Sequence, residues 1–545
     1  MLLFPARVLE CDAVTYASAA VTRNLPVLAD PGHLGFGFLE YAATLAGERM
    51  RPAMSPVCLL QYLSMLAGLA GVCLFHRLLR AMNTEPRTAL LLSAVLFVSY
   101  GYWHYSLQAE PHILATLFLI LFLSRLWRFL KFPTASHGAA VGAFLGLATL
   151  MHQSNVLLAP IVLMGGAFSR AARVSLTTFC AVFCGFVIPP YLGVGWTLLG
   201  LRSVHDFRDW ILGLSLWGPW GHWNLTSSVQ AAVGSARCLA GSHFLLGIRP
   251  VERFAQRMFP RASWGDEMAV ASSVSEGLCY ALAAIEVGIL AGAVMAIVWW
   301  LRKLFRMFSV ERGFAVCLLT WIAVLTLFFT WWAPVRVEFW IAPFLPILVV
   351  LGYPLPQGAM KGQTRRWLWS AFALGLFVVN FCGSIRPQSM ASLEPETAAA
   401  MAIEAVVEPG SIVVSDAGFC GRTSKYVISF ERIDLVSRCC SVISDGESLH
   451  QREPGPSGDP PATGITGNRL VEEDLGMRAC RLVDSLLTDS DPRGRSLYLL
   501  ASPVSSDRGR ALLYERLVAA VGERYDISET VPVRAAVNMR SLKRR

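Results

Sequence analysis

Charged residues are scarce in this chain, and their scarcity excludes most soluble folds. Asp, Glu, Lys and Arg make up 16% of the 545 residues, whereas about 25% is usual in soluble domains. The net charge of +9 does not indicate nucleic-acid binding, because many arginines lie in short loops between apolar segments. The composition, with 54% hydrophobic residues, therefore predicts a protein that lies in a lipid bilayer and does not bind nucleic acid.

The chain also lacks the short motifs that identify many metal and nucleotide sites. Its thirteen cysteines show no metal-ligand spacing. The C-terminal region contains no glycine-rich phosphate or dinucleotide fingerprint. The C-terminal region has four cysteines, which could form one disulfide whose pairing the sequence does not determine: Cys420, Cys439, Cys440 and Cys480.

Long apolar runs are present instead, and they predict membrane helices. A helix needs about 20 residues to cross the hydrocarbon core of a bilayer. The nearly continuous runs are 57–75, 88–103, 113–130, 174–193, 280–301, 314–331, 339–353 and 367–381. The stretch 138–168 is interrupted at His152, so we interpret it as two short re-entrant or shallow helices. The expected fold is an α-helical polytopic membrane protein with about ten transmembrane or re-entrant helices.

Basic residues gather in every second loop, which predicts the orientation of the bundle. Arg77, Arg80 and Arg87 share one loop, and Arg128 with Lys131 mark the next basic one. Such loops stay cytoplasmic. We therefore expect a multi-pass protein of a bacterial inner or plasma membrane, with its active site and both terminal regions extracytoplasmic.

Three regions are expected along the chain. Residues 1–54 form an extracytoplasmic N-terminal region, and we expect a first membrane helix to be missing from a misplaced start. Residues 55–386 form the multi-span domain, with a long outer loop at 201–276. Residues 387–545 are predicted to form a small extracytoplasmic α/β domain. Its expected strands are 411–415, 425–430 and 496–500, its helices are 397–407, 472–487 and 507–521, and 453–467 is a disordered loop.

Asp12 and Tyr16 are the first candidate site residues. They lie one helical turn apart in DAVTYA, so both side chains are expected on one face of a short helix. Asp is a preferred N-cap residue. The sequence leaves the cap and the catalytic acid equally open.

Glu110 ends an aromatic segment, YGYWHYSLQAEPH, at the outer junction of two runs. Tyr102, Trp103 and Tyr105 are typical of an interfacial belt. A carboxylate at the edge of hydrocarbon tends to mark function or a buried partner. A second explanation stays open, because Pro111 would begin a helix whose positive end favours Glu110.

His152 and Arg336 complete the candidates. His152 interrupts an apolar stretch, so it is expected to line a cavity, since broken backbone at membrane depth needs protein or water around it. Arg336 lies in WWAPVRVEFWIAPFLP on the side where basic residues are unusual. It could hold a lipid phosphate with its planar fork, or pair with Glu338.

The order of these segments, together with GLATLMHQSNVLLAP, resembles the GT-C superfamily of integral-membrane glycosyltransferases, which includes protein mannosyltransferases and aminoarabinose transferases. The likeness covers roughly residues 10–385. It implies transfer of a sugar from a polyprenyl-phosphate carrier to an acceptor at the outer face, usually with inversion. By this resemblance Asp12 matches the catalytic acid of the first outer loop, and Glu110 the acidic position of the second.

The expected function is thus a polyprenyl-phosphate-dependent glycosyltransferase of the cell envelope, with an unidentified acceptor. Asp12 and Glu110 are the catalytic candidates. The substrate-binding candidates are Tyr16, His33, His112, His152, Arg336 and Glu338. Glu110 and His112 could bind a divalent metal, and no other cofactor is expected. A secondary transporter and a non-catalytic scaffold or sensor remain as alternatives.

Overall fold

The structure, a computed structural model, describes residues 6, 11–50, 56–168, 173–217, 221, 223, 226–258, 270–353, 362–390, 412–415, 431–434, 497–500, 525–533 and 537–544. The chain forms two compact units, Met1–Leu393 and Glu394–Arg545. The described part of the first unit is helical, and the described part of the second consists of strands.

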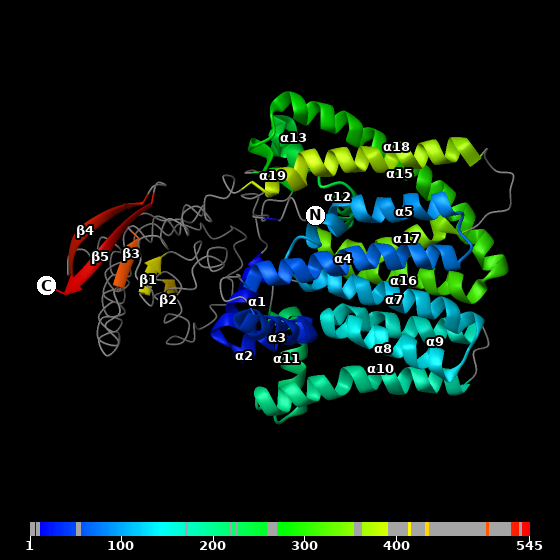
Figure 1. Cartoon of the computed structure of the whole chain (residues 1–545), viewed down its shortest axis with the longest axis horizontal. Coiled ribbons are helices and arrows are strands. Elements are labelled where there is room, and N and C mark those ends of the chain that lie inside the picture. Colours follow the sequence, from blue (N-terminus) through cyan, green and yellow to red (C-terminus); the bar gives the residue numbers. More distant parts are fainter. Residues whose placement is uncertain are drawn as a thin grey trace, which may run out of the picture. The chain divides into compact units, whose positions relative to one another are not determined.

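Long apolar helices build the first unit. Six are long and apolar enough to cross a bilayer: α4 (Pro56–Ala81), α7 (Pro111–Lys131), α10 (Arg173–Gly193), α15 (Glu276–Val310), α16 (Arg312–Trp332) and α18 (Gly362–Asn380). Shorter apolar pieces are α5 (Pro86–Val98), α8 (Ala135–Met151), η2 (Gln153–Leu158) with α9 (Ala159–Phe168), and η5 (Val337–Trp340) with α17 (Ile341–Gly352). Figure 1 shows most of these helices side by side along one direction. The chain is therefore a helical integral membrane protein, while the total of about ten membrane helices stays a prediction.

The predicted run 88–103 is two helices rather than one. Its backbone becomes extended at Ser99, between α5 and α6 (Tyr100–Tyr105). The side chain of Asn380 satisfies backbone groups beside this break: it donates to Val98 O at 2.7 Å and to Leu239 O at 2.9 Å, and it accepts from Gly241 N at 2.8 Å. Such pairing is needed because an unsatisfied backbone group in an apolar interior is costly.

The aromatic residues of α6 do not form an interfacial belt. Tyr102, Trp103 and Tyr105 are 1%, 4% and 3% exposed. Tyr102 Oη donates to Gly68 O at 2.7 Å inside the bundle. The belt interpretation is wrong because the break at Ser99 turns this short helix into the protein interior instead of along the lipid boundary.

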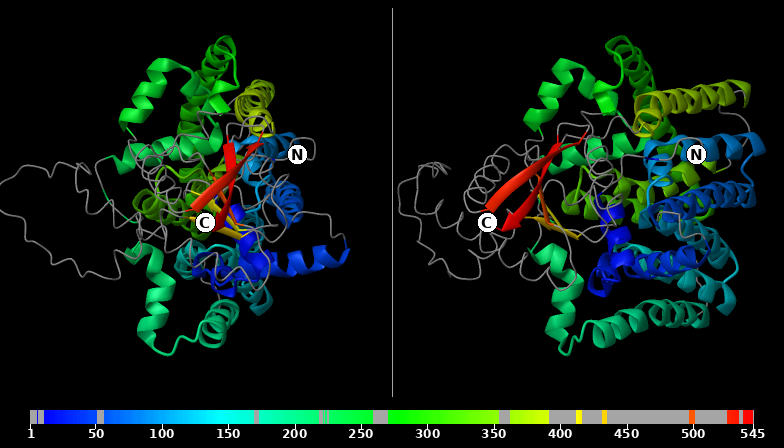
Figure 2. Two further views of the ribbon diagram at one scale, coloured as in Figure 1. Left: turned by 90° about the vertical axis from the view of Figure 1, so that its left-hand side faces the viewer. Right: turned by 60° about the vertical axis from the view of Figure 1, so that its left-hand side comes forward.

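Small residues bring α8 and α10 into close contact. Gly138, Gly142 and Gly146 recur at every fourth position of α8 and face α10. A Cβ added at Gly142 would lie 2.7 Å from Phe179 O. This spacing is the small-residue pattern by which membrane helices approach backbone to backbone. Figure 2 shows α10 at the edge of the unit, so α8 provides much of its packing surface.

The N-terminal helices lie at one end of the bundle. They are α1 (Cys11–Thr22), α2 (Leu25–Leu28), η1 (Pro31–His33) and α3 (Leu34–Met50), and Figure 1 shows them in dark blue beside the ends of α4 and α8. Ala13 and Ala17 of α1 pack against Val57 and Leu60 of α4. Asp12 lies in the first turn of α1.

The remaining elements of the first unit connect or cover the long helices. They are η3 (Val194–Leu198), α11 (Val204–Trp217), α12 (Ser227–Leu239), η4 (His243–Gly247), α13 (Arg249–Met258), η6 (Phe381–Ile385) and α19 (Arg386–Gln388).

Five strands form one sheet in the second unit. They are β1 (Ile412–Ser415), β2 (Glu431–Asp434), β3 (Leu497–Leu500), β4 (Tyr525–Val533) and β5 (Val537–Arg544), in the order β2-β1-β3-β5-β4. β1 pairs in parallel with β2 and β3, and β5 pairs antiparallel with β3 and β4. Strands thus occur at two predicted positions, 411–415 and 496–500. The predicted helices, the strand at 425–430, the loop at 453–467 and the four cysteines lie outside the described residues, so the α/β class stays a prediction.

Candidate active site

Asp30 anchors one side of the candidate site. It caps η1, and its Oδ1 accepts from Gly32 N at 2.8 Å. Its other oxygen, Oδ2, accepts from Tyr16 Oη at 2.6 Å. Burial, and then the charge and hydrogen bond of Asp30, raise the pKa of Tyr16 well above its usual value. Tyr16 therefore remains a neutral phenol that donates to Asp30.

Three histidine rings from separate elements meet beside this pair. The centroid distances are 5.8 Å for His33 and His112, 4.8 Å for His33 and His152, and 5.2 Å for His112 and His152. His33 Nδ1 donates to Met151 O at 3.0 Å, which fixes the orientation of the ring. His152 Nδ1 lies 2.7 Å from Ser154 Oγ. The rings cluster because η1, the start of α7 and the end of α8 meet at one end of the bundle.

Glu110 and Glu338 face the cluster from two sides. Glu110 Oε2 lies 3.4 Å from His112 Nε2. Tyr105 Oη donates to Glu338 Oε2 at 2.7 Å, and the Tyr105 ring lies 5.3 Å from the His112 ring. Arg336 Nη1 lies 3.6 Å from Glu338 Oε1. Arg336 therefore pairs with Glu338, one of the two roles that the sequence allows. Its side chain is still 44% exposed.

A small cavity opens between α7, η2, α16 and η5. Its polar lining includes His112, Thr116, His152, Ser154, Asn155 and Glu338, and its aromatic lining is Phe329 and Phe339. The Phe339 ring lies 5.6 Å from His152, edge to face. Asp12, Glu110 and Arg336 do not line this cavity, although Glu110 and Arg336 contact residues that do. His152 lies at a cavity, as the interrupted apolar stretch predicts.

Asp12 lies outside this cluster but close to it. Its side chain is exposed in the first turn of α1. Its charge, like that of Glu110, adds to the effect that raises the pKa of Tyr16. The two candidate carboxylates thus act on one phenol from different elements, and Asp12 is the one that solvent can reach.

The described residues include the Glu110–His112 pair but no larger group of metal ligands. Among them, no group of three or more His, Cys, Asp or Glu side chains is arranged to hold a metal ion. Glu110 Oε2 and His112 Nε2 contact each other, and the three imidazole rings meet edge to face or tilted. A divalent metal held by Glu110 and His112 stays a prediction.

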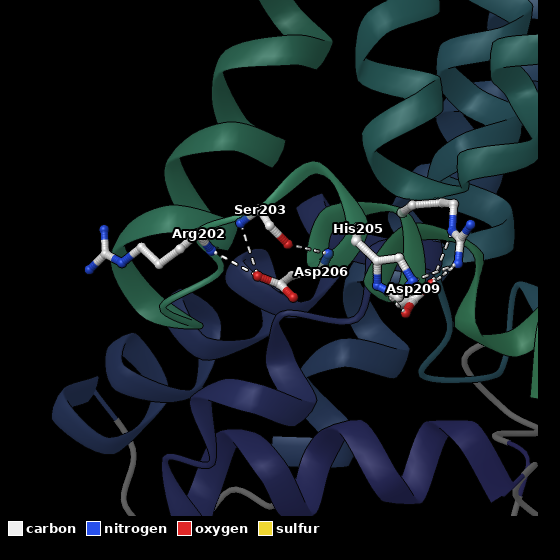
Figure 3. Close-up of polar contacts among 6 residues, drawn as sticks. Arg202, Ser203, His205, Asp206 and Asp209 are labelled. Carbon is white, nitrogen blue, oxygen red and sulfur yellow. Dashed lines mark hydrogen bonds and ion pairs between the residues drawn. The ribbon is translucent and has the colours of Figure 1, made fainter.

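The carboxylates at the start of α11, in the loop 201–276, have local partners (Figure 3). Asp206 Oδ2 accepts from Ser203 N at 2.9 Å and Arg202 N at 3.2 Å, while Ser203 Oγ accepts from Asp206 N at 3.1 Å. This is a reciprocal cap at the start of α11, and it lowers the pKa of Asp206, first through Ser203. Asp209 lies 3.0 Å from His205 Nδ1 and also pairs with Arg208.

One residue of the same loop does reach the N-terminal helices. Trp210 Nε1 donates to Ala29 O at 3.1 Å, next to Asp30. The loop therefore packs against the element that carries Asp30 and His33, whereas its aspartates cap and stabilise α11.

Sequence reasoning missed Asp30 and the role of Tyr105. A signal for Asp30 was available, because Asp-Pro-Gly is a strong turn signature whose Asp accepts from nearby backbone. Tyr105 gave no such signal, since only tertiary packing brings it to Glu338, 233 positions away.

Comparisons with known proteins identify the fold. No family model and no curated protein sequence matches the chain. Two solved structures of ArnT from Cupriavidus metallidurans match over nearly its whole length. The structure bound to undecaprenyl phosphate has a TM-score of 0.55 at 11% identity, covering 98% of this chain and 94% of that one. The apo structure has a TM-score of 0.53 at 12% identity, covering 99% and 94%. The chain therefore has the fold of ArnT.

Proposed function

We propose that this protein transfers a glycosyl group from a polyprenyl-phosphate-linked sugar to an acceptor at the outer face of the membrane. The observation that carries the proposal is the cluster of acid, phenol and imidazole groups where helices end, in a bundle whose fold matches ArnT. The carrier class is supported by the undecaprenyl phosphate in one of those ArnT structures.

Asp12 is proposed as the general base. In the reaction the acceptor oxygen forms a bond to the anomeric carbon, the bond from that carbon to the phosphate oxygen breaks, and polyprenyl phosphate leaves. The acceptor proton passes to the Asp12 carboxylate. Attack opposite to the leaving phosphate inverts the anomeric centre. Asp30 is less suited to this role because both of its oxygens already accept hydrogen bonds.

The remaining candidates are proposed to hold the substrates. Arg336 would stabilise the departing phosphate, because its guanidinium is half-exposed beside the cavity and always charged. Glu338 and Tyr105 fix its position. Tyr16, His33, Glu110, His112 and His152 would orient the acceptor hydroxyl.

The test is Asp12→Asn in purified protein reconstituted with a lipid-linked sugar. Asn keeps the size and polarity of the residue but cannot take the proton, so transfer should fall on the order of 100-fold or more. Asp206→Asn is the matched control, because the Asn amide oxygen can still accept from Ser203 N at the start of α11, and it should retain full activity. Full activity of Asp12→Asn, with unchanged membrane abundance, would disprove the assignment of the base. Failure of the unaltered protein to consume any lipid-linked sugar would disprove the function.

A further inference from the structure

Helix α13 carries a basic surface that the proposed reaction does not use. Arg249, Arg253 and Arg257 recur at every fourth position and are all exposed. At about 100° per residue they lie within one sector of about 80° on the helix surface. Arg253 Nε donates to the backbone oxygen of Arg249 at 3.4 Å, so the Arg253 side chain lies along the helix toward Arg249.

The opposite side of α13 packs on the protein. Ala255 is buried against Leu246 of η4 and Ala271, five positions before α15 begins. Helix α13 therefore lies at the end of α15 where that long apolar helix leaves the bilayer. Figure 1 shows α13 at the end of the bundle near the start of α15.

An exposed aromatic residue lies on one flank of the arginine line. Phe254 is 61% exposed and, by the same rotation, follows the arginines around the helix before the buried face. Glu252 and Gln256 occupy the other flank and hydrogen-bond to each other at 3.2 Å. The carboxylate is therefore directed to Gln256 on the flank away from Phe254.

We infer that α13 is an interfacial helix that binds anionic phospholipid headgroups. The three guanidiniums would pair with headgroup phosphates, while Phe254 would enter the boundary between headgroups and acyl chains. The helix supplies both parts of such a site, a row of positive charge and an adjacent apolar side chain, at the level where headgroups lie. The inference depends on the membrane nature of the chain and not on its catalytic activity.

The test uses full-length protein purified in a zwitterionic detergent. Native mass spectrometry would compare retention of phosphatidylglycerol with that of phosphatidylcholine. Each basic residue near an anionic surface strengthens binding roughly fivefold, so the triple variant R249Q/R253Q/R257Q should lose on the order of 100-fold of the preference for phosphatidylglycerol. Glu252→Gln is the matched control on the same helix, and it should keep or strengthen the preference. Phe254→Ser should weaken retention of both lipids.

Three outcomes would overturn the inference. One is an equal preference in the unaltered protein and the triple variant. Another is no preference for phosphatidylglycerol in the unaltered protein. The third is full displacement of the lipid by inorganic phosphate at the same concentration, which would indicate a free-phosphate site rather than a lipid surface. Circular dichroism and size-exclusion profiles matching the unaltered protein ensure that loss of preference is not loss of fold.

Discussion

At the residue scale, the half-buried carboxylates of Asp30 and Glu338 differ from the fully buried carboxylate of Glu40. Asp30 accepts a hydrogen bond from the hydroxyl of Tyr16, and Glu338 accepts one from the hydroxyl of Tyr105. Glu40 of α3 is 0% exposed, and neither carboxylate oxygen has a hydrogen-bond partner among the described residues. A polar group is expensive to bury without such partners. The first two carboxylates therefore stabilise the site, whereas Glu40 makes the stability of the fold depend on pH.

Glu40→Gln should change that dependence. Burial raises the pKa of Glu40 from 4.5 to about 9. Between those values the folded state keeps a proton that the unfolded state has lost, so stability falls as pH rises from about 4.5 to 9. Gln stays neutral, so the variant should be more stable than the unaltered protein at pH 8.5, by on the order of 5 kcal/mol, and nearly equal at pH 4.5. Thermal unfolding in detergent at both pH values measures this. Glu252→Gln at the surface is the control, and a pH slope identical to that of the unaltered protein would show that Glu40 is not buried as a neutral acid.

At the element scale, close helix contacts and helix breaks determine where the site lies. The end of α8 at Met151 places His152 beside His33, because the Met151 carbonyl accepts from the His33 ring. The position of α8 depends in turn on its glycine face against α10. A change on that face should therefore disturb packing first and the site second.

Gly142→Leu should separate α8 from α10. The new side chain would enter the space that Phe179 O and Phe183 N occupy, 2.7 and 3.0 Å from a Cβ. Overpacking of this kind costs about 1–3 kcal/mol. We expect a lower unfolding temperature and less protein in the membrane. Gly185→Leu on α10 is the control, because a Cβ there meets nothing within 4 Å. Equal stability of the two variants would contradict the close contact.

At the scale of the whole molecule, the site residues lie where apolar helices begin or end. His112 is the second residue of α7, and Arg336 and Glu338 lie between α16 and α17. All of these ends are on the side that the alternation of basic loops predicts to be extracytoplasmic. A lipid-linked donor in that leaflet would reach them without crossing the bilayer.

Cysteine labelling of intact cells tests this orientation. Single cysteines placed in the loop 201–276 should react with a membrane-impermeant reagent, because that loop is predicted to face outward. Cysteines beside Arg128 or Arg365 should react only after the membrane is opened. Labelling of the opposite set would reverse the predicted topology and place the proposed base on the wrong side of the membrane.

The sequence by itself determined the class of the protein and the outline of its helices. Apolar runs of sufficient length predict membrane helices because lipid leaves no other way to satisfy the backbone, and the interruption at His152 predicts the break that the structure contains. Pro111 begins α7 as its fixed φ favours.

Only the tertiary structure decided which polar residues meet. Tyr105 and Glu338 are 233 positions apart, and the sequence favours an interfacial belt for Tyr105 because composition cannot distinguish a lipid-facing aromatic residue from a buried one. Asp30 became a candidate only when Tyr16 was seen to donate to it. Periodicity reports which face of one helix is apolar, whereas an active site depends on the relative placement of several helices, and long-range packing sets that placement.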